Sequence, residues 1–424
     1  MSHSMANIPP PTGELYLRHL ITGAREALSD TPVVLIHGPR QAGKSTLARS
    51  MISEDFPAEY VTFDDLLVLG AARASPKDFL ARYKGPVVID EVHRAPELFL
   101  ALKAEVDRRR VPGRYLLTGS ANVRFVPEIS QALVGRVEIL TLWPLSQGEI
   151  EGRRETFLDS VFAGEVPRAA GEALDRGEIL SRAWVGGFPE AVRRRSAARR
   201  RAWFASYITT VLQREVRDMA EVEGLPQLPR LLALIATRVG GIQNVSDLSR
   251  ASGLPQTTLK RYLALLQAAF LIQTMPAWSG NLGKRLLKSP KLFVSDTGLL
   301  AHLLGLEIEG IDFPGAPVGR ILESFVVAEL RKQLGWSEVR PAIHHFRSAR
   351  QEEIDILLEG RGGRVVGIEV KASSAVSSRD FRHLGTLRDE LGERFVGGFV
   401  LHTGRDAVSF GDRIHAVPVS SLWR

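Results

Sequence analysis

The chain has 424 residues, of which 44% are hydrophobic and 24% charged, a composition typical of a folded globular protein with several domains of roughly 100–200 residues each. It contains no cysteine, which excludes disulfides, thiolate zinc sites and cysteine nucleophiles. No apolar run approaches the roughly 18 residues of a membrane helix, and the polar, proline-rich first residues do not resemble a signal peptide. We therefore expect a cytoplasmic protein without membrane contact. The formal charge of +7 favours a polyanionic partner.

A glycine-rich loop follows the first apolar run of the chain. Residues 33–36 (VVLI) are typical of a buried strand, and residues 38–46 (GPRQAGKST) have the spacing G-x-x-x-x-G-K-[ST] of a P-loop. The two glycines let backbone N–H groups turn toward a polyphosphate, and the next helix directs its positive end there. Lys44 would contact the β- and γ-phosphates, and Ser45 would bind Mg²⁺. The predicted ATP or GTP contacts are Gly38, Pro39, Arg40, Gln41, Ala42, Gly43, Lys44, Ser45 and Thr46.

Short apolar runs alternate with helical stretches up to about residue 143, as in parallel α/β domains. The predicted strands are residues 33–36, 60–63, 87–89, 115–118 and 138–142. Asp90 and Glu91 directly follow the third strand, and ligands of open α/β sheets lie at the carboxyl ends of strands. We predict that Asp90 holds Mg²⁺ and that Glu91 polarises the water attacking the γ-phosphate. An acidic pair that merely ends a strand is the alternative.

The next strand ends in a polar run, residues 118–122 (TGSAN). A polar side chain at this place could contact the γ-phosphate or the attacking water. Thr118, Ser120 and Asn122 compete for this sensor role, and the sequence does not separate them. Ser120 is included among the predicted nucleotide contacts.

Several motifs together resemble one family. Residues 38–46, 90–93 (DEVH), 117–120 (LTGS) and 133–136 (LVGR) are similar to a bacterial and archaeal branch of AAA+-type P-loop ATPases with a C-terminal domain of unknown function. Residues 143–146 (WPLS) and 186–190 (GGFPE) also look like this family, and the resemblance runs from about Tyr16 to the C-terminus. It implies that Arg136 is an arginine finger for ATP hydrolysis. A structural or surface arginine is the alternative, and a homo-oligomer is left open.

A helical stretch, residues 157–223, follows the ATPase region. Its basic clusters at residues 193–195 and 199–201 are typical of solvated helix faces. Trp203, Phe204 and Tyr207 have the spacing of side chains that pack a helix, so we predict that they belong to the core. The family resemblance implies that this stretch is a helical lid.

Residues 241–278 have the pattern of a helix-turn-helix. We predict a first helix capped by Ser246, a turn at residues 253–255, and a second helix over residues 256–266. Gln256, Thr257, Thr258, Lys260 and Arg261 would face outward, where a recognition helix meets DNA. Residues 275–294, with Lys284, Arg285 and Lys288, would supply a basic β-wing. A protein-interaction module is the alternative to DNA contact.

The C-terminal part carries a second group of charged residues. Asp355 lies in a predicted strand, residues 352–358, and Glu369 and Lys371 lie on one face of the next, residues 365–371. Glu323 is a lone acid in an apolar helix upstream. This pattern resembles the restriction-endonuclease-like fold, the PD-(D/E)xK superfamily, although Ile354 stands where the motif has proline.

The resemblance implies that Glu323, Asp355 and Glu369 bind Mg²⁺ and that Lys371 assists the attacking water. The alternative is a surface hairpin with a cross-strand ion pair.

The predicted fold class is α/β, with a parallel-sheet P-loop core, helices and a C-terminal α/β domain. The predicted domains are an AAA+-like core (16–155), a helical lid (156–225), a winged helix-turn-helix (226–310) and a restriction-endonuclease-like domain (311–424). We expect an ATP-hydrolysing protein that uses ATP, Mg²⁺ and DNA, as an ATP-dependent or ATP-regulated DNA nuclease in repair, recombination or defence. The alternatives are a nucleotide-controlled DNA-binding or signalling switch that does not cut, and a C-terminal dock for a protein partner.

Overall fold

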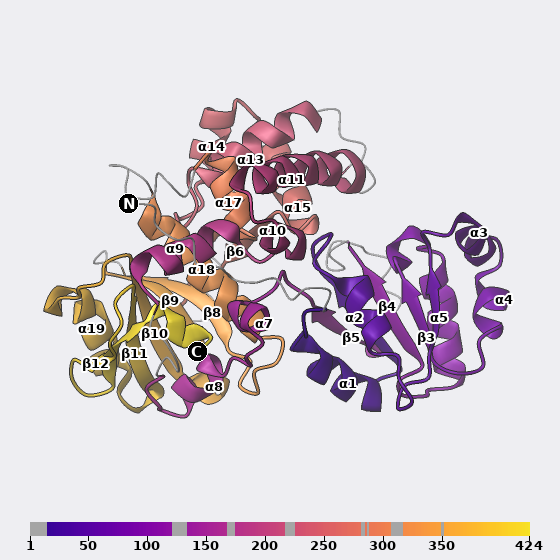
Figure 1. The fold of residues 1–424 in the computed structure, drawn as a ribbon, viewed down its shortest axis with the longest axis horizontal. Helices are drawn as coiled ribbons and strands as arrows, with labels where there is room; N and C mark the ends of the chain where they lie inside the picture. The colour runs from indigo at the N-terminus through magenta and orange to yellow at the C-terminus, as the bar shows by residue number, and fades with distance from the viewer. Residues whose placement is uncertain are drawn as a thin grey trace.

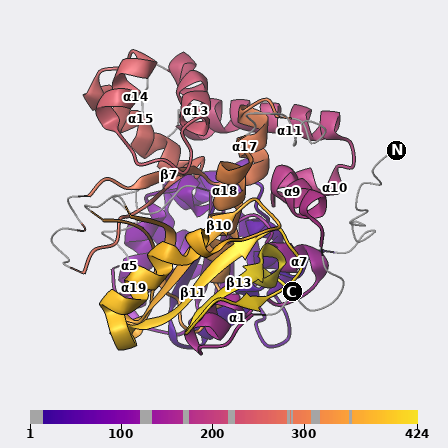
Figure 2. The ribbon, with the colours of Figure 1, turned by 90° about the vertical axis from the view of Figure 1, so that its left-hand side faces the viewer.

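A computed structural model describes residues 15–120, 134–167, 174–216, 225–280, 285, 288–306, 317–348 and 352–424. Figure 1 shows a parallel-sheet core, a mixed-sheet domain that ends the chain, and a group of helices above them. In Figure 2 the C-terminal sheet lies in front of the core, and the helix-turn-helix lies above both. Within the described part of the chain, no helix is long and apolar enough to cross a membrane.

The core is a five-stranded parallel sheet with the strand order β2-β3-β4-β1-β5. The predicted strands are confirmed, with bounds that differ by a residue or two: β1 (Val33–His37), β2 (Glu59–Thr62), β3 (Val87–Asp90), β4 (Tyr115–Gly119) and β5 (Val137–Thr141). One face packs on α1 (Leu20–Asp30) and α2 (Lys44–Ser50). The other packs on α3 (Leu66–Ala74), α4 (Pro76–Ala81) and α5 (Leu98–Arg108). Strand β1 is flanked by β4 and β5, so the loop that follows it lies at the carboxyl end of an inner strand.

The helical part contains α9 (Arg176–Val185), α10 (Pro189–Arg193), α11 (Ala197–Thr210), α13 (Leu228–Ala236), α14 (Val245–Ser252), α15 (Gln256–Ala268) and α17 (Thr297–Leu303). Helices α14 and α15 are the predicted helix-turn-helix, and α15 buries Leu259, Tyr262, Leu263 and Leu266. The predicted cap was wrong. Asn244, not Ser246, accepts the Asp247 N–H at 3.0 Å and starts α14. Strands β6 (Ile272–Met275) and β7 (Lys291–Val294) form an antiparallel pair after α15.

The C-terminal domain is a mixed sheet with the order β12-β13-β11-β10-β9-β8. Its elements are α18 (Val318–Gln333), β8 (Ala342–Arg347), β9 (Glu353–Glu359), β10 (Val365–Lys371), α19 (Arg382–Leu391), β11 (Phe395–His402), β12 (Val408–Ser409) and β13 (Ile414–Pro418). The predicted hairpin is confirmed, because β9 and β10 pair antiparallel. The helix α8 (Phe157–Phe162) packs on this sheet, with the rings of Phe157 and Phe399 6.3 Å apart.

A buried network joins the core to the rest of the molecule. Lys332 on α18 donates to Leu145 O at 2.9 Å and to Glu329 Oε1 at 2.5 Å. Glu329 Oε2 accepts the N–H of Gln147, the first residue of α7 (Gln147–Glu151), at 2.8 Å. Asp296, at the start of α17, accepts the Gly187 N–H at 2.8 Å. Because a buried charge without its partners is costly, these bonds hold the segment that follows β5 against α18 and α17.

Candidate nucleotide site and carboxylate cluster

The P-loop has the geometry that its sequence predicts. Gly38 is required, because a Cβ there would lie 2.1 Å from Leu142 O. Gly43 starts α2 with φ 98°, a left-handed conformation that suits glycine. The Lys44 side chain is buried, and its Nζ donates to the carbonyls of Gly38 at 3.0 Å and Pro39 at 2.9 Å. The lysine is thus held inside the loop that a polyphosphate would occupy.

Asp90 lies beside the P-loop at the end of β3. Its Oδ1 accepts the Ser45 hydroxyl at 3.0 Å, and its Oδ2 accepts the Tyr60 hydroxyl at 2.6 Å. Thr118 on β4 also donates to Oδ1. Burial and the hydrogen bond to Asp90 raise the pKa of Tyr60 to about 12, so the phenol stays protonated and donates. Ser45 and Asp90 supply adjacent hard oxygen donors, which fit a Mg²⁺ ion that arrives with the nucleotide.

Glu91 follows with an unusual backbone conformation, φ 56°. Its Oε2 lies 3.2 Å from His93 Nδ1, but the geometry makes no hydrogen bond. Burial lowers the pKa of His93 to about 4, so this histidine is neutral and the contact is no ion pair. Burial also raises the pKa of Glu91. The carboxyl group therefore lies at the predicted place, where burial raises its pKa and the charges of Lys44 and Arg40 act in the opposite direction.

The remaining predicted residues of this site are placed differently. Ser120 is buried directly after β4, between the strands that carry Asp90 and the P-loop, whereas Asn122 lies outside the described residues. Arg136 directly precedes β5, whose first residue Val137 pairs with Val33 at the start of β1. Arg136 binds Asp107 and Val134 O at the amino ends of the strands, whereas the P-loop lies at their carboxyl ends. Arg136 therefore does not reach the nucleotide site of its own chain.

A cavity of about 700 Å³ lies over the P-loop, and its second wall comes from the helical part. This wall contains Glu190 and Arg193 of α10, Arg194, and Trp203 of α11. Arg194 pairs with Glu190 Oε2 at 2.6 Å. Arg193 and Arg195 are exposed, as expected of a solvated face, whereas Arg194 is half-buried against Glu190.

Trp203 has two roles in this wall. It stacks on Tyr207 at 5.2 Å between ring centroids, as a core residue does, and it also borders the cavity. Next to it, Arg18 donates to Ala42 O of the P-loop at 2.7 Å and contacts Glu149 at 3.0 Å. No local pattern in the sequence predicts these contacts of Arg18.

The four predicted C-terminal residues also come together, but with an additional lysine. Lys291, delivered by β7 of the helical part, lies 2.9 Å from Glu323 Oε1 and 2.9 Å from Glu353 Oε1. Lys371 pairs with Glu369 Oε2 at 3.1 Å, and Asp355 Oδ2 accepts the Val370 N–H at 2.9 Å. We call these residues the carboxylate cluster: Glu323, Glu353, Asp355 and Glu369 with Lys291 and Lys371.

The carboxylate cluster combines four acids with two lysines, and their charges shift one another's pKa values. Burial and the nearby charge of Asp355 raise the pKa of Glu323 to about 7 and that of Glu369 to about 8. Burial alone would lower the pKa of Lys291, but the carboxylates of Glu323 and Asp355 raise it above its usual value. In the described ranges, no group of three or more acid or histidine side chains is arranged to hold a metal ion. In this arrangement Glu323, Asp355 and Glu369 therefore do not fit a bound Mg²⁺ ion.

The predicted basic wing is only partly turned outward. Arg285 forms two hydrogen bonds to Glu359 of β9, at 2.6 and 2.9 Å. Lys288 is exposed and donates to Arg347 O at 3.1 Å. Lys284 lies outside the described residues. The expectation of an outward basic wing was therefore wrong for Arg285, which attaches the β6–β7 segment to the C-terminal domain, whereas Lys288 is exposed as expected.

Three segments of the chain match models of known protein families. Residues 30–151 match a family model described as AAA domain, and residues 176–309 and 318–422 match two models described as domains of unknown function, DUF8612 and DUF4143. Among solved structures, the Walker-type ATPase of Pyrococcus abyssi is 14% identical with a TM-score of 0.43, covering 69% of this chain and 97% of that one. The RuvB Holliday junction branch migration motor of Thermotoga maritima is 19% identical with a TM-score of 0.30, covering 66% and 98%.

Two curated relatives match nearly the whole chain. The uncharacterized proteins Rv2008c of Mycobacterium tuberculosis and Mb2031c of Mycobacterium bovis are each 32% identical over 401 residues, covering 94% of this chain and 82% of the relative. With the P-loop, the Asp90 site and the parallel sheet in place, the chain belongs to the family of these two proteins and is a P-loop AAA-type ATPase.

Proposed function

We propose that this ATPase is a nucleotide-controlled DNA-binding switch. The observation that carries the proposal is the double wall of the nucleotide cavity, with the P-loop on one side and Glu190, Arg193 and Arg194 on the other. The second wall belongs to the helical part, which also carries the helix-turn-helix. A nucleotide in this cavity would contact both parts at once, so its state can set their relative position.

The residues of the first wall have distinct tasks in hydrolysis. Lys44 neutralises the phosphates, and Ser45 and Asp90 would hold Mg²⁺, which supplies charge stabilisation at the γ-phosphate. Glu91 orients the attacking water and takes its proton. Its raised pKa, caused mainly by burial, makes it a stronger base than an exposed glutamate.

The second wall supports the switching step. Arg194 is paired with Glu190, and a γ-phosphate is a doubly charged competitor for the same guanidinium. ATP would therefore draw Arg194 from Glu190, and loss of the γ-phosphate would return it. Helix α10 continues after a short turn into α11, and α11 packs against α17. A shift of α10 would thus be passed into the helical part.

DNA is the partner that the helix-turn-helix favours. Gln256, Thr257 and Lys260 are exposed at the start of α15, where a recognition helix contacts a groove. The net charge of +7 supports a polyanionic partner. Because Arg285 is bound to Glu359, we place the main contact on α15 rather than on the β6–β7 segment.

The test is DNA affinity in different nucleotide states. Fluorescence anisotropy with a labelled duplex should give an affinity that differs by about tenfold between a non-hydrolysable ATP analogue and ADP, a coupling of about 1.4 kcal/mol. Arg194→Gln should remove most of this difference, whereas Arg154→Gln, outside the cavity, should keep it. Equal affinity in both states, or no binding that weakens with salt, would contradict the proposal.

A Mg²⁺-dependent DNA nuclease is the second candidate, because Glu323, Asp355, Glu369 and Lys371 converge as the restriction-endonuclease resemblance implies. A helix, α19, also follows β10. In this candidate, Lys291 must leave the carboxylate cluster before a metal ion can enter. Wild-type protein with ATP and Mg²⁺ or Mn²⁺ should then cut duplex, branched or single-stranded DNA, and Lys371→Ala should stop cutting while ATPase activity continues. The absence of any cutting removes this candidate and leaves the switch.

Arg136 stays a proposed arginine finger that acts on a neighbouring copy. Its position away from its own nucleotide site requires this arrangement. The ATPase rate should then rise more than linearly with protein concentration, and Arg136→Ala should abolish the excess. A strictly linear rate would leave Arg136 as a partner of Asp107 only.

A further inference from the structure

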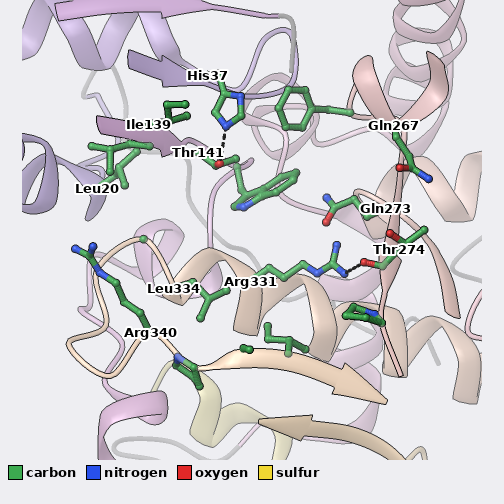
Figure 3. Close-up of a pocket in the computed structure, with 18 of the residues that line it drawn as sticks. Leu20, His37, Ile139, Thr141, Gln267, Gln273, Thr274, Arg331, Leu334 and Arg340 are labelled. Atoms are coloured by element: carbon green, nitrogen blue, oxygen red, sulfur yellow. Dashed lines mark hydrogen bonds between the residues drawn. The ribbon is translucent and has the colours of Figure 1, made fainter. Parts of the chain in front are cut away.

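A second cavity, of about 650 Å³, lies where the three parts of the molecule meet (Figure 3). Its upper side comes from the ATPase sheet with His37 and Thr141, and its right side from the helix-turn-helix part with Gln267, Gln273 and Thr274. The lower side comes from the end of α18 and the segment before β8. This cavity is separate from the one over the P-loop, because their lining residues do not overlap.

The charge of the second cavity has one sign. Arg331 and Arg340 line it, and no aspartate or glutamate does among the residues that the structure describes. Arg331 donates to Thr274 O at 2.7 Å, and in the described part of the chain no acidic side chain pairs with it. Burial lowers the pKa of Arg331 to about 10, so the guanidinium still carries its charge at neutral pH. A partly buried cation without a counter-ion is costly, which favours an anionic ligand.

The upper wall is aromatic. Phe270 is buried between His37 and Trp143, with ring centroids at 5.3 and 5.5 Å and both pairs edge-on. Phe270 holds φ 56°, a conformation that is rare for a bulky residue and that persists only where its surroundings require it. The amides of Gln267 and Gln273 stand beside these rings and offer both donors and acceptors. Such a wall suits a planar ring with polar edges.

We propose that this cavity binds a free nucleoside monophosphate, with its phosphate on Arg331 and its base beside Trp143 and Phe270. A cavity of about 650 Å³ has the size that pockets for small ligands usually have. The site is additional to the ATP site of the proposed function and does not depend on DNA binding.

The cavity is also connected to the P-loop through the chain. His37 accepts or donates a hydrogen bond with Thr141 at 2.8 Å and directly precedes Gly38, the first residue of the loop. A ligand that presses on His37 would act on the residue next to the phosphate site. By reciprocity, binding of a monophosphate and binding of MgADP should change each other's affinity by the same factor.

The test uses the full chain with its P-loop saturated by MgADP. Isothermal titration with UMP and with AMP should show one site each, and Arg331→Gln should weaken binding about tenfold or more, since it removes a charge-assisted contact. Arg340→Gln, on an exposed side chain, should weaken it less. Arg361→Gln, an exposed arginine on the C-terminal domain that does not line the cavity, should leave it unchanged.

Further arms separate the other outcomes. Ala342→Trp, which fills the cavity without removing a charge, should also abolish binding, so the proposal stays testable if Arg331→Gln does not fold. A thymidine oligonucleotide that binds while UMP and AMP do not would overturn the proposal. So would inorganic phosphate that binds as tightly as UMP, because the aromatic wall would then contribute nothing. Monophosphate binding that is indifferent to Arg331→Gln, Arg340→Gln and Ala342→Trp would place the ligand elsewhere and overturn it as well.

Discussion

The molecule has buried lysines near carboxylates in two places, and their hydrogen-bond partners differ. At the P-loop, Lys44 is bonded to backbone carbonyls, while Asp90 is bonded to hydroxyls of Ser45, Tyr60 and Thr118. In the carboxylate cluster, Lys291 bonds directly to two acids, Glu323 and Glu353. Lys44 is thus held on the backbone of the loop, next to the space that a polyphosphate would occupy. In the carboxylate cluster, Lys291 is bound to acids of the protein itself.

The difference shows that a motif supplies residue types and that the surrounding fold decides their charge state. Both places contain the charged residues that the sequence patterns predict. Only the first presents adjacent oxygen donors that fit Mg²⁺. The second is closed by a cation from another part of the chain, and this closure favours a switch over a permanently active nuclease. Four predictions test this difference between the two sites and its functional consequence.

The largest effect is expected at the P-loop. Lys44→Ala should lower the ATPase rate by about 10³-fold, because it removes the buried ammonium group that would neutralise the β- and γ-phosphates. Phosphate release measures this directly. Lys84→Ala, on an exposed lysine that caps a turn, is the matched control and should retain full activity. A Lys44→Ala protein with a tenth of the wild-type rate would place hydrolysis outside the P-loop.

The next effect tests the closed cluster. Lys291 is 2% exposed, and Lys291→Met should destabilise the protein by about 3 kcal/mol because it leaves buried acids without their cation. Lys371, which is 33% exposed and paired with one acid, should cost less than about 1 kcal/mol as Lys371→Met. Denaturant unfolding measures both. The double variant Lys291→Met/Glu323→Gln should recover part of the loss, and no recovery would mean that the two side chains are not coupled.

The pH dependence should differ from that of an ordinary protein. The pKa values of Glu323 and Glu369, raised mainly by burial to about 7 and about 8, lie above those of the unfolded chain. Between roughly pH 4.5 and 8 the folded state therefore binds more protons, and stability falls as pH rises, by at most about 1.4 kcal/mol per pH unit for each group. Unfolding at pH 5.5 and pH 8 checks the sign. Glu369→Gln should flatten the slope, and a slope that is unchanged would contradict the assignment.

The smallest effect concerns DNA. Lys260→Ala should weaken DNA binding about threefold at moderate salt and reduce the slope of log K against log salt by about 1, as loss of one phosphate contact does. Lys77→Ala, an exposed lysine of the ATPase core, is the control. Anisotropy over a salt series measures both variants. Equal effects of the two substitutions would show that α15 is no specific contact surface.

The fold and the first site were largely predictable because their signals are local. Alternating apolar runs indicated each core strand, and the spacing of Gly38, Gly43 and Lys44 indicated the loop. The contacts of Tyr60 and Thr118 with Asp90 were not predictable, since they depend on β2 and β4 lying beside or near β3, and strand order is not written in any local pattern. The choice between Asn244 and Ser246 as helix cap is also undecided locally, because both residue types cap well.

The missed residues of the second wall and of the cluster have the same physical origin. Arg193 and Arg194 belong to a basic run that usually faces solvent, but both also line the cavity over the P-loop, and Arg194 is half-buried against Glu190. Lys291 and Glu353 lie far apart in the sequence, and no sequence pattern connects them. They meet only because β7 packs on the C-terminal domain. A lone lysine in an apolar strand was the one available signal, because a buried lysine requires an acid.

The buried junction has a consequence for dividing the chain into fragments. A cut after residue 151 would separate Leu145 and Gln147 from Lys332 and Glu329, leaving two charges in an apolar interior without their backbone partners. A fragment that starts at residue 318 would also lose Phe162, which packs on Gly360. Expression trials that follow the matched family segments should therefore give aggregating pieces, whereas a fragment from about residue 144 to the C-terminus keeps both contacts.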